Sequence, residues 1–273
     1  MKKGDKVLDN RAIGVFDSGL GGLTGVQRLY ELLPNESIVY FGDTGRVPYG
    51  SKSRETIEEY ARQDEAFLLS KNVKIIIAAC GTVSSVAAHT GDDLPVPFMG
   101  VVEPTARLCA KSTKNFRIGV IGTSATVNSA AYEKALLKIN SNFKIKSRAC
   151  PMFVPLVEEG WIENDIVAKI CVERYLKEIK DFGVDTLILG CTHYPLIAET
   201  IAEYMGDEVT LISAGDAVAR ECAEVLRSND MLNDGNSMPS HKFYVTDRPE
   251  GFARTADIFL KGGINGSVEQ VRI

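Results

Sequence analysis

The chain has 273 residues, of which 45% are hydrophobic and 25% charged, as in an ordinary soluble globular protein. This length allows one large α/β domain or two lobes with substantial cores, so the fold needs neither a disulfide nor a metal for stability. The net charge of −5 comes from 36 acidic and 31 basic residues scattered along the chain, and nucleic acid is therefore not expected as the main partner.

The opening segment and the cysteines indicate the compartment. Residues Met1–Asn10 are polar and lack the apolar core of a secretory signal, and the longest strongly apolar run, Ile75–Cys80, is too short to span a bilayer. We therefore expect a cytoplasmic protein that does not contact the membrane. The six cysteines are widely and irregularly spaced without a Cys-x-x-Cys pair, which predicts free thiols and no disulfide framework.

Short β-branched runs alternate with amphipathic segments along the chain, which is the pattern of βαβ units and a parallel sheet. The runs are apolar throughout, as expected for strands covered by helices on both faces. The predicted strands are Ala12–Phe16, Ser37–Phe41, Val73–Ala79, Arg117–Ile121, Thr186–Leu189 and Thr210–Ser213.

Two of the intervening segments, Ser53–Ser70 and Asn164–Phe182, have clear helical signals. Ser53 is the expected N-cap of the first, and Gly183 stands where the second should end in a left-handed residue. The residues expected to face the sheet are Ile57, Tyr60, Ala61, Phe67 and Leu68 in the first helix, and Val167, Ile170, Cys171 and Ile179 in the second.

A glycine-rich loop, residues 17–25, follows the first strand and opens a helix. Such a turn lets backbone N–H groups approach a ligand closely. A dinucleotide site is one alternative, but Thr24 stands where the third glycine of that motif belongs, and Asp17 would lie beside the pyrophosphate. Asp17 suits an ammonium group or the proton of a thiol better. A simple tight turn is the other alternative.

The segment Tyr40–Gly50 leaves the second strand and carries hydrogen-bonding groups on a constrained backbone. Taken alone, its Pro48-Tyr49-Gly50 end is as consistent with a turn as with a binding loop. The segment is informative only together with the other motifs.

Two cysteines, Cys80 and Cys191, occupy equivalent places in similar segments. Val73–Thr82 and Val184–His193 are each an apolar strand that ends in a cysteine followed by small or polar residues. A single cysteine after such a strand is more often a small buried hydrophobe than a reactive group. The pair favours the reactive interpretation, because ligands of parallel α/β sheets bind at the carboxyl ends of the strands.

These features predict an α/β protein of two similar three-layer lobes with mainly parallel sheets, and an active site in the cleft between them. The first lobe is expected to comprise residues 1–102 and 212–273 and to carry Cys80. The second is expected to comprise residues 103–211 and to carry Cys191.

A thiol on each side of a cleft suits the inversion of a carbon stereocentre, because one group must remove a proton from one face while another delivers one to the opposite face. Two groups of the same type are well matched, since each is base in one direction and acid in the other. Cysteine has a reference pKa of about 8.5, so modest help brings both protonation states within reach. The candidate catalytic residues are Cys80 and Cys191, with Asp17 near the first, His193 near the second, and Glu158 on the second side.

Backbone and hydroxyl donors at Ser18, Thr82 and Thr192 are candidates for holding a carboxylate and stabilising the charge that develops there. A zinc site made of Cys80, Cys191 and His193 is an alternative use of the thiols. It lacks a close-spaced ligand pair and a clear fourth donor, so no metal is expected.

Taken in order, these motifs closely resemble those of the glutamate racemases in the aspartate/glutamate racemase superfamily. The resemblance spans about residues 13–216. It runs through residues 14–23, Gly42-Asp-Thr, Pro48-Tyr-Gly50, Ala79-Cys-Gly-Thr82, Gly100-Val-Val-Glu-Pro104, Ile121-Gly-Thr-Ser-Ala-Thr126, residues 189–196 and Ile212-Ser-Ala-Gly215.

The resemblance implies interconversion of L- and D-glutamate without pyridoxal phosphate, metal or other cofactor, supply of D-glutamate for peptidoglycan, and a homodimer. By matched motif, Cys80 and Cys191 are the catalytic pair. The residues expected to line the substrate are Asp17, Ser18, Tyr49, Gly50, Gly81, Thr82, Thr123, Thr126, Thr192 and His193.

One departure concerns Gly81, because the family usually has Asn after the first catalytic cysteine, so one side-chain contact to substrate is missing. Gly25, where a β-branched residue is more usual, is a smaller departure. Two alternatives stay open from the sequence: an aspartate racemase of the same superfamily, and a non-catalytic amino-acid-binding or metal-binding protein of the same fold.

Overall fold

The computed structural model describes residues 9–162 and 164–273, so the expectation for Met1–Asn10 falls almost entirely outside the described residues. The strands are β1 (Ile13–Asp17), β2 (Ile38–Gly42), β3 (Ile75–Ala78), β4 (Phe98–Gly100), β5 (Arg117–Gly122), β6 (Lys144–Ala149), β7 (Thr186–Leu189), β8 (Thr210–Ser213), β9 (His241–Val245) and β10 (Ser267–Gln270). The longer helices are α1 (Leu23–Leu32), α2 (Arg54–Ser70), α4 (Val102–Ser112), α6 (Ala131–Ile139), α8 (Ile166–Asp181), α9 (Ala198–Met205), α10 (Ala214–Ser228) and α11 (Pro249–Phe259). The shorter ones are α3 (Gly81–Val86), α5 (Ser124–Ser129), α7 (Phe153–Glu158), η1 (Tyr49–Ser51), η2 (Ala88–Gly91) and η3 (Tyr194–Ile197).

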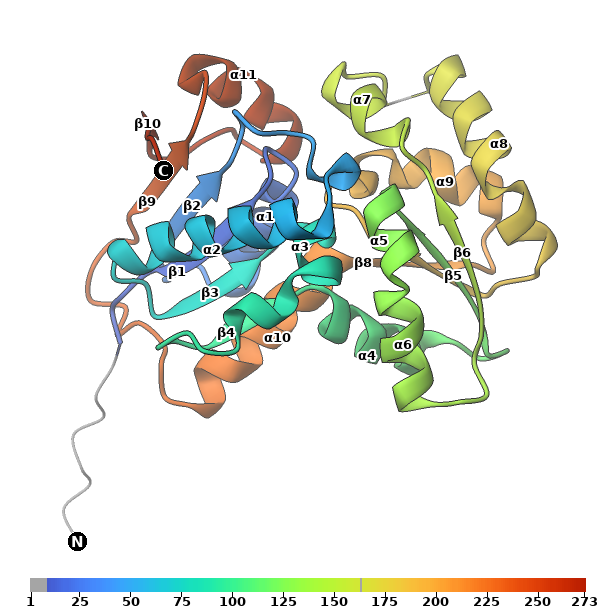
Figure 1. Cartoon of the computed structure of the whole chain (residues 1–273), viewed down its shortest axis with the longest axis horizontal. Coiled ribbons are helices and arrows are strands. Elements are labelled where there is room, and N and C mark those ends of the chain that lie inside the picture. Colours follow the sequence, from blue (N-terminus) through green and yellow to red (C-terminus); the bar gives the residue numbers. More distant parts are fainter. Residues whose placement is uncertain (1–8, 163) are drawn as a thin grey trace, which may run out of the picture.

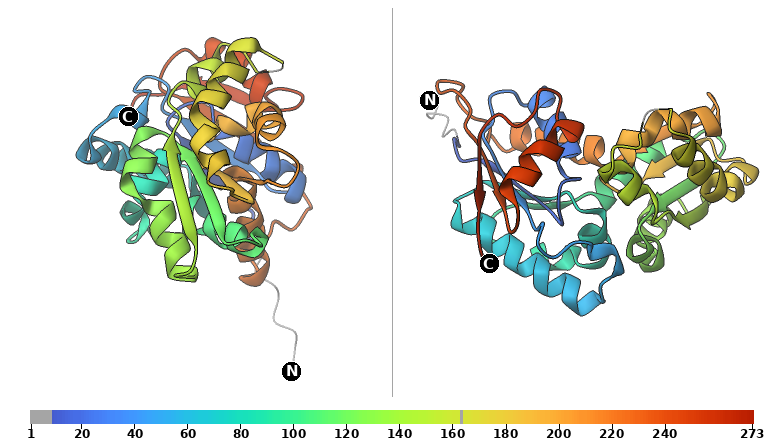
Figure 2. Two further views of the ribbon diagram at one scale, coloured as in Figure 1. Left: turned by 90° about the vertical axis from the view of Figure 1, so that its right-hand side faces the viewer. Right: turned by 90° about the horizontal axis from the view of Figure 1, so that it is seen from above.

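The described strands form two separate sheets, one in each half of the molecule (Figures 1 and 2). The first has the order β10-β9-β2-β1-β3-β4 and the second the order β6-β5-β7-β8. Neighbouring strands are parallel in both sheets. The α/β class with mainly parallel sheets is therefore confirmed.

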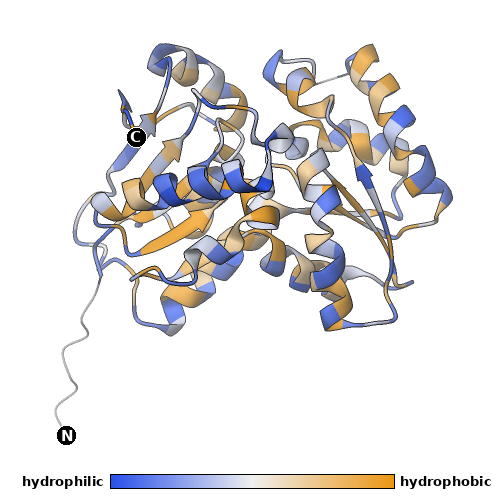
Figure 3. Cartoon of the chain, in the orientation of Figure 1, coloured by the Kyte–Doolittle hydropathy of each residue, from blue (hydrophilic) through white to orange (hydrophobic). Residues whose placement is uncertain are grey.

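Each sheet is covered by helices on both faces, because its strands are apolar on both. In the first sheet Val15 packs in the core beneath α1, α10 and α11, whereas its neighbour Phe16 packs in the core beneath α2. In the second sheet Ile188 packs with α4 and α6, and Leu187 with α8 and α9. Figure 3 shows the inner strand β3 as hydrophobic and much of α2 as hydrophilic.

The chain passes from the first sheet to the second between β4 and α4 and returns between β8 and α10. In the first sheet, β2 and β3 lie on opposite sides of β1, and in the second, β6 and β7 lie on opposite sides of β5. These reversals of strand order leave a crevice at the carboxyl ends of β1 and β3 and of β5 and β7, where parallel sheets bind ligands.

The two predicted helices form, with one error in the second. Ser53 caps α2 by accepting a hydrogen bond from the Thr56 N–H. In α8 the predicted inward residues Val167 and Ile170 are wrong, since their exposed fractions are 38% and 56% and Cys171 is only half-buried. The helix begins after the Asp165 cap, and its inward face is Ala168, Val172, Leu176 and Ile179.

The error in α8 has a simple cause. The sequence has apolar residues on more than one face of the helix. The buried face consists of Ala168, Val172, Leu176 and Ile179, which are spaced four, four and three residues apart. Gly183 has φ of +75°, as predicted for the residue after this helix. Of the helices in the described ranges, none combines the length and the apolar character needed to cross a membrane.

Candidate active site

A cavity of about 400 Å³ lies where the carboxyl ends of the two sheets meet, within the size range of small-molecule sites. All the predicted site residues line this cavity except Asp17 and Thr126, which lie directly behind it. The lining residues are Ser18, Gly19, Val47, Pro48, Tyr49, Gly50, Ser51, Cys80, Gly81, Thr82, Thr123, Ser124, Pro151, Val154, Pro155, Glu158, Gly190, Cys191, Thr192 and His193.

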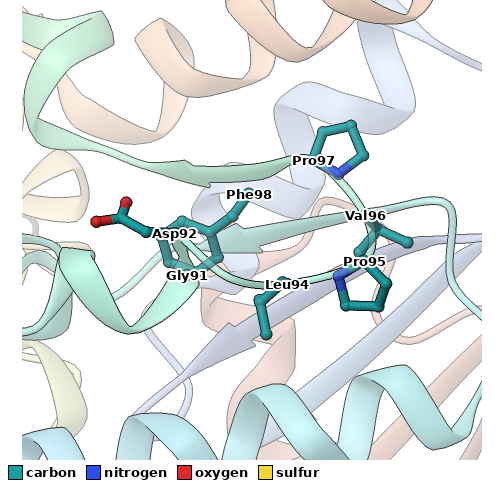
Figure 4. Close-up of a pocket in the computed structure, with 7 residues that line it drawn as sticks. All are labelled: Gly91, Asp92, Leu94, Pro95, Val96, Pro97 and Phe98. Atoms are coloured by element: carbon teal, nitrogen blue, oxygen red, sulfur yellow. The ribbon is translucent and has the colours of Figure 1, made fainter.

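A second, more open hollow of about 520 Å³ lies along the loop 91–98 that leads into β4 (Figure 4). One loop supplies all of its lining, and Asp92, whose carboxylate points away from the curve of the loop in Figure 4, is the one ionisable residue among them. Because no set of polar groups converges there, we place the chemistry in the cleft between the sheets.

Cys80 and Cys191 stand at matching places in the two halves. Cys80 follows β3 and precedes α3, and Cys191 follows β7, with exposed fractions of 4% and 7%. The Cys80 thiol donates to the Ser18 hydroxyl at 3.6 Å. Burial, reinforced by the Asp17 carboxylate, raises the pKa of Cys80 to about 12. Without a ligand, Cys80 therefore keeps its proton at neutral pH.

Asp17 is the last residue of β1 and is buried behind Ser18. Its Oδ1 atom accepts the Gly19 N–H at 3.0 Å, which fixes the start of the glycine-rich loop. Burial raises the pKa of Asp17, and His193 across the cleft opposes that shift. Asp17 thus influences both sides of the cavity through charge without lining it.

His193 lies at the centre of a polar cluster on the second side. Its Nε2 atom is 3.0 Å from Oε1 of Glu158, and Nδ1 is 3.4 Å from the Thr192 hydroxyl and 4.0 Å from the Cys191 sulfur. Burial alone would lower the pKa of His193, but the bonds to Cys191 and Glu158 and the charge of Asp17 raise it to about 10. A protonated imidazole therefore lies beside Cys191 at neutral pH.

Two threonines connect the halves beside the cysteines. The hydroxyl oxygens of Thr82, at the start of α3, and Thr123, at the end of β5, are 3.1 Å apart. Thr123 also caps α5 by accepting the Thr126 N–H at 3.2 Å and donates to the Thr126 hydroxyl at 3.0 Å. Thr126 therefore fixes Thr123 from behind, which explains why it belongs to the motif without lining the cavity.

The Tyr49 side chain is buried, and its hydroxyl points away from the cavity. It lies between the carboxylates of Asp43 and Asp64, 3.2 Å from Oδ2 of Asp64. Arg46 bonds to the same two carboxylates, at 2.5 Å and 3.3 Å. This network fixes the segment 43–51, so Tyr49 and Gly50 form a rigid wall of the cavity and the Tyr49 hydroxyl is unavailable to a ligand.

Part of the cavity lining was not predicted from the sequence. Pro151 comes from the connection between β6 and α7, Val154 and Pro155 lie in the first turn of α7, and β6 itself was not predicted. A proline-rich apolar stretch just ahead of Glu158 was the available signal. The other lining residues outside the prediction are Gly19, Val47, Pro48, Ser51, Ser124 and Gly190, all within two positions of residues that were predicted.

The cysteines are all free, and within the described residues no group of three or more His, Cys, Asp or Glu side chains is arranged to hold a metal ion. The site therefore offers two thiols, one imidazole, the Glu158 carboxylate and several hydroxyls around a cavity the size of a small metabolite, with the Asp17 carboxylate behind the lining. Such groups are suited to moving protons.

Proteins similar to this chain in sequence are racemases, which also move protons. The sequence pattern of the family described as Asp/Glu/Hydantoin racemase matches residues 26–222. The chain is 45% identical over 264 residues to a glutamate racemase of Geobacter metallireducens, an alignment that covers 96% of this chain and 97% of that protein. It is 44% identical over 240 residues to a glutamate racemase of Bacillus cereus, covering 88% and 89% of the two chains.

Solved structures share the fold as well. The crystal structure of a glutamate racemase from Francisella tularensis in complex with D-glutamate superposes with a TM-score of 0.90 at 41% identity, covering 97% of this chain and 98% of that one. A glutamate racemase from Bacillus anthracis gives a TM-score of 0.92 at 37% identity, with the same coverage. An aspartate racemase homologue from Pyrococcus horikoshii, at 15% identity and a TM-score of 0.57, shares the fold alone.

Proposed function

The chain belongs to the Asp/Glu/Hydantoin racemase family, and on that basis we propose that it interconverts L- and D-glutamate by proton transfer between the α-carbon and two cysteines. The observation that carries the proposal is the placement of Cys80 and Cys191 at the carboxyl ends of strands from two different sheets, both lining one cavity.

The reaction is two proton transfers on opposite faces of one carbon. A thiolate takes the α-proton, so a C–H bond breaks and an S–H bond forms, and the electron pair moves into the adjacent carboxylate. The thiol on the other side then gives its proton to the opposite face of the carbon, which leaves that sulfur as the thiolate. The products are the mirror-image amino acid and an enzyme with its thiol and thiolate exchanged.

The protonation states of the site favour one starting arrangement. Cys80 holds its proton, because burial and Asp17 raise its pKa to about 12. A protonated His193 places positive charge beside Cys191. We therefore assign Cys191 as base and Cys80 as acid in the ligand-free enzyme. Each cysteine is therefore the base for one enantiomer and the acid for the other, and its proton must be restored before the next turnover in the same direction.

Hydroxyl groups are suited to hold the substrate carboxylates. Ser18, Thr82, Thr123 and Thr192 line the cavity, and among the described lining residues there is no Lys or Arg. Hydroxyl and backbone N–H donors are therefore assigned to the α-carboxylate, where they stabilise the charge that develops as the proton leaves. The substrate ammonium group finds complementary charge in Asp17 and Glu158.

The wider role follows from the same family. We assign to the enzyme the supply of D-glutamate for peptidoglycan in the cytoplasm, without cofactor or metal and as a homodimer. Turnover by protein freed of metal and cofactors tests the assigned independence of cofactor and metal, and sedimentation tests the homodimer.

The direct test follows the optical signal of L-glutamate and of D-glutamate with purified protein in heavy water. Racemisation with deuterium entering the α-position is expected. Because the two substrates are mirror images with an equilibrium constant of one, kcat/KM must be equal in both directions. Preferential turnover of aspartate would identify an aspartate racemase instead of a glutamate racemase. Absence of turnover of either amino acid would refute the proposal.

A further inference from the structure

Phe259 contacts the imidazole of His193 from the opposite half of the molecule. The two ring centroids are 5.4 Å apart and the ring planes stand at 89°. Phe259 is the last residue of α11, in the half that contains Cys80, whereas His193 follows Cys191 in the other half. Figure 1 shows α11 and α7, which ends at Glu158, on facing sides of the two halves.

The polar contacts of the imidazole do not fix its orientation by themselves. The bond to Glu158 at 3.0 Å is a full hydrogen bond, but the distances of 3.4 Å to Thr192 and 4.0 Å to Cys191 are long for such contacts. The Glu158 side chain is 45% exposed, so water competes for the one good bond. The terminal torsion of a histidine is broad, and packing therefore decides where the Nδ1 atom points.

Phe259 is rigid enough to provide that packing. Its exposed fraction is 4%, and it belongs to the core that also holds Phe252, Ala256 and Leu260. The chain just beyond the helix is tied to α1, because the Lys261 N–H donates to the Gln27 side chain at 3.0 Å. The phenyl ring cannot leave His193 without disturbing the core of its own half.

We propose that Phe259 is a positioning residue for racemisation, whose ring holds the His193 imidazole in the orientation that serves Cys191 while the two halves are together. This inference rests on the proposed function. Because the ring and the imidazole belong to different halves, the contact depends on how the two halves pack together. This packing thus completes the proton-handling group on the second side.

The charges around His193 give the contact a measurable signature. The titratable groups that face the imidazole are Cys191 beside it, Glu158 on α7 and Asp17 at the end of β1. Together they raise the pKa of His193 to about 10, against an ordinary value of 6.5. An imidazole that is free to rotate loses the contact with Cys191, and its pKa moves back toward the ordinary value.

The test compares Phe259→Leu with the matched control Phe252→Leu. Both side chains lie on α11 with exposed fractions of 4% and 3%, but Phe252 packs against the rings of Tyr40 and Phe243 and not against His193. We expect Phe259→Leu to lower kcat at least tenfold with less than a threefold change in KM, and to move the alkaline limb of the kcat profile to lower pH. The control should change kcat less than threefold.

A second readout does not depend on activity. The His193 ring is followed by NMR titration, with its resonance assigned from His193→Gln, and in Phe259→Leu it should titrate at least one pH unit lower than in the control. Equal kinetics for the two variants, or an unchanged His193 titration, would overturn the inference. Phe259→Met replaces the leucine variant if that one fails to fold. Failure of the wild-type protein to racemise glutamate would instead refute the proposed function, while the titration still tests the contact.

Discussion

Gly81 and Gly190, the neighbours of the two cysteines, touch across the cleft: a β-carbon placed on Gly81 would stand 2.3 Å from the carbonyl oxygen of Gly190. Real β-carbons essentially never lie within 3.0 Å of a non-bonded heavy atom. The halves therefore meet here only because residue 81 has no side chain. This explains a glycine at a position where the racemases that the sequence resembles usually have Asn. In this arrangement an Asn side chain has no room.

A methyl group at residue 81 should therefore hold the cleft open. Overpacking costs about 1–3 kcal/mol, which corresponds to a loss of about 5- to 150-fold in the closed population. We expect Gly81→Ala to lower kcat/KM for both enantiomers by about that factor. The matched control is Gly251→Ala on α11, where the new β-carbon meets only Arg248 at 3.6 Å. Activity of Gly81→Ala within twofold of the control would show that the contact does not limit closure.

The wall formed by the segment 43–51 should depend on the Tyr49 hydroxyl. Its loss in Tyr49→Phe leaves the buried Asp43 and Asp64 carboxylates with one donor fewer, at a cost of about 1–3 kcal/mol in the free energy of unfolding. KM should rise more than kcat falls, because the wall binds substrate and takes no part in proton transfer. Denaturant unfolding and steady-state kinetics measure both effects.

The control for Tyr49→Phe is Tyr60→Phe, which keeps the ring that packs against Tyr49 and lies beneath the Arg46 guanidinium. That variant should retain the KM of the wild type. Unchanged stability and KM in Tyr49→Phe would mean that the arginine alone fixes the segment.

The sequence predicted the buried part of the fold and missed its polar edges. Six strands were identifiable from their apolar runs, and five of them, β1, β2, β3, β5 and β7, are buried almost throughout. β6 and β10 were not, since both are edge strands rich in polar and charged residues, and β4 has only three residues. β9 lies inside its sheet but begins with His241 and Lys242, which weakens the apolar signal.

The site was predictable to the extent that it follows from strand ends. Cys80, Cys191 and Thr123 each follow a parallel strand at a reversal of strand order, so their convergence follows from topology. Phe259 has no such signal. It lies 66 positions after His193, in a helix whose sequence predicts only an ordinary buried face. Only the packing of the two halves brings the two rings together.

Glu158 should control the alkaline side of the pH profile. The pKa of His193 is raised to about 10 in the folded protein from an ordinary value of 6.5, so its contribution to stability is complete below pH 6.5 and is lost as the pH rises through about 10. Glu158→Gln removes one of the causes of that shift, and the loss should begin at lower pH. Unfolding at pH 7 and pH 9.5 measures it.

The neighbouring Glu159→Gln provides the control for Glu158→Gln, because it removes the same charge one residue away from the hydrogen bond to His193. The alkaline limb of kcat should move to lower pH in Glu158→Gln and stay in place in the control. Identical limbs in the two variants would assign the shift to Cys191 and Asp17 alone.

The central claim is that Cys80 and Cys191 act from opposite faces of one carbon. It is tested by following optical inversion and α-deuterium uptake together in heavy water for Cys80→Ala and Cys191→Ala. We predict that each variant loses racemisation, by at least the 10²- to 10⁴-fold typical of a general acid or base, and that any residual exchange occurs with a different enantiomer in each. Inversion at a near wild-type rate by either variant, or exchange of the same enantiomer by both, would contradict the two-thiol mechanism.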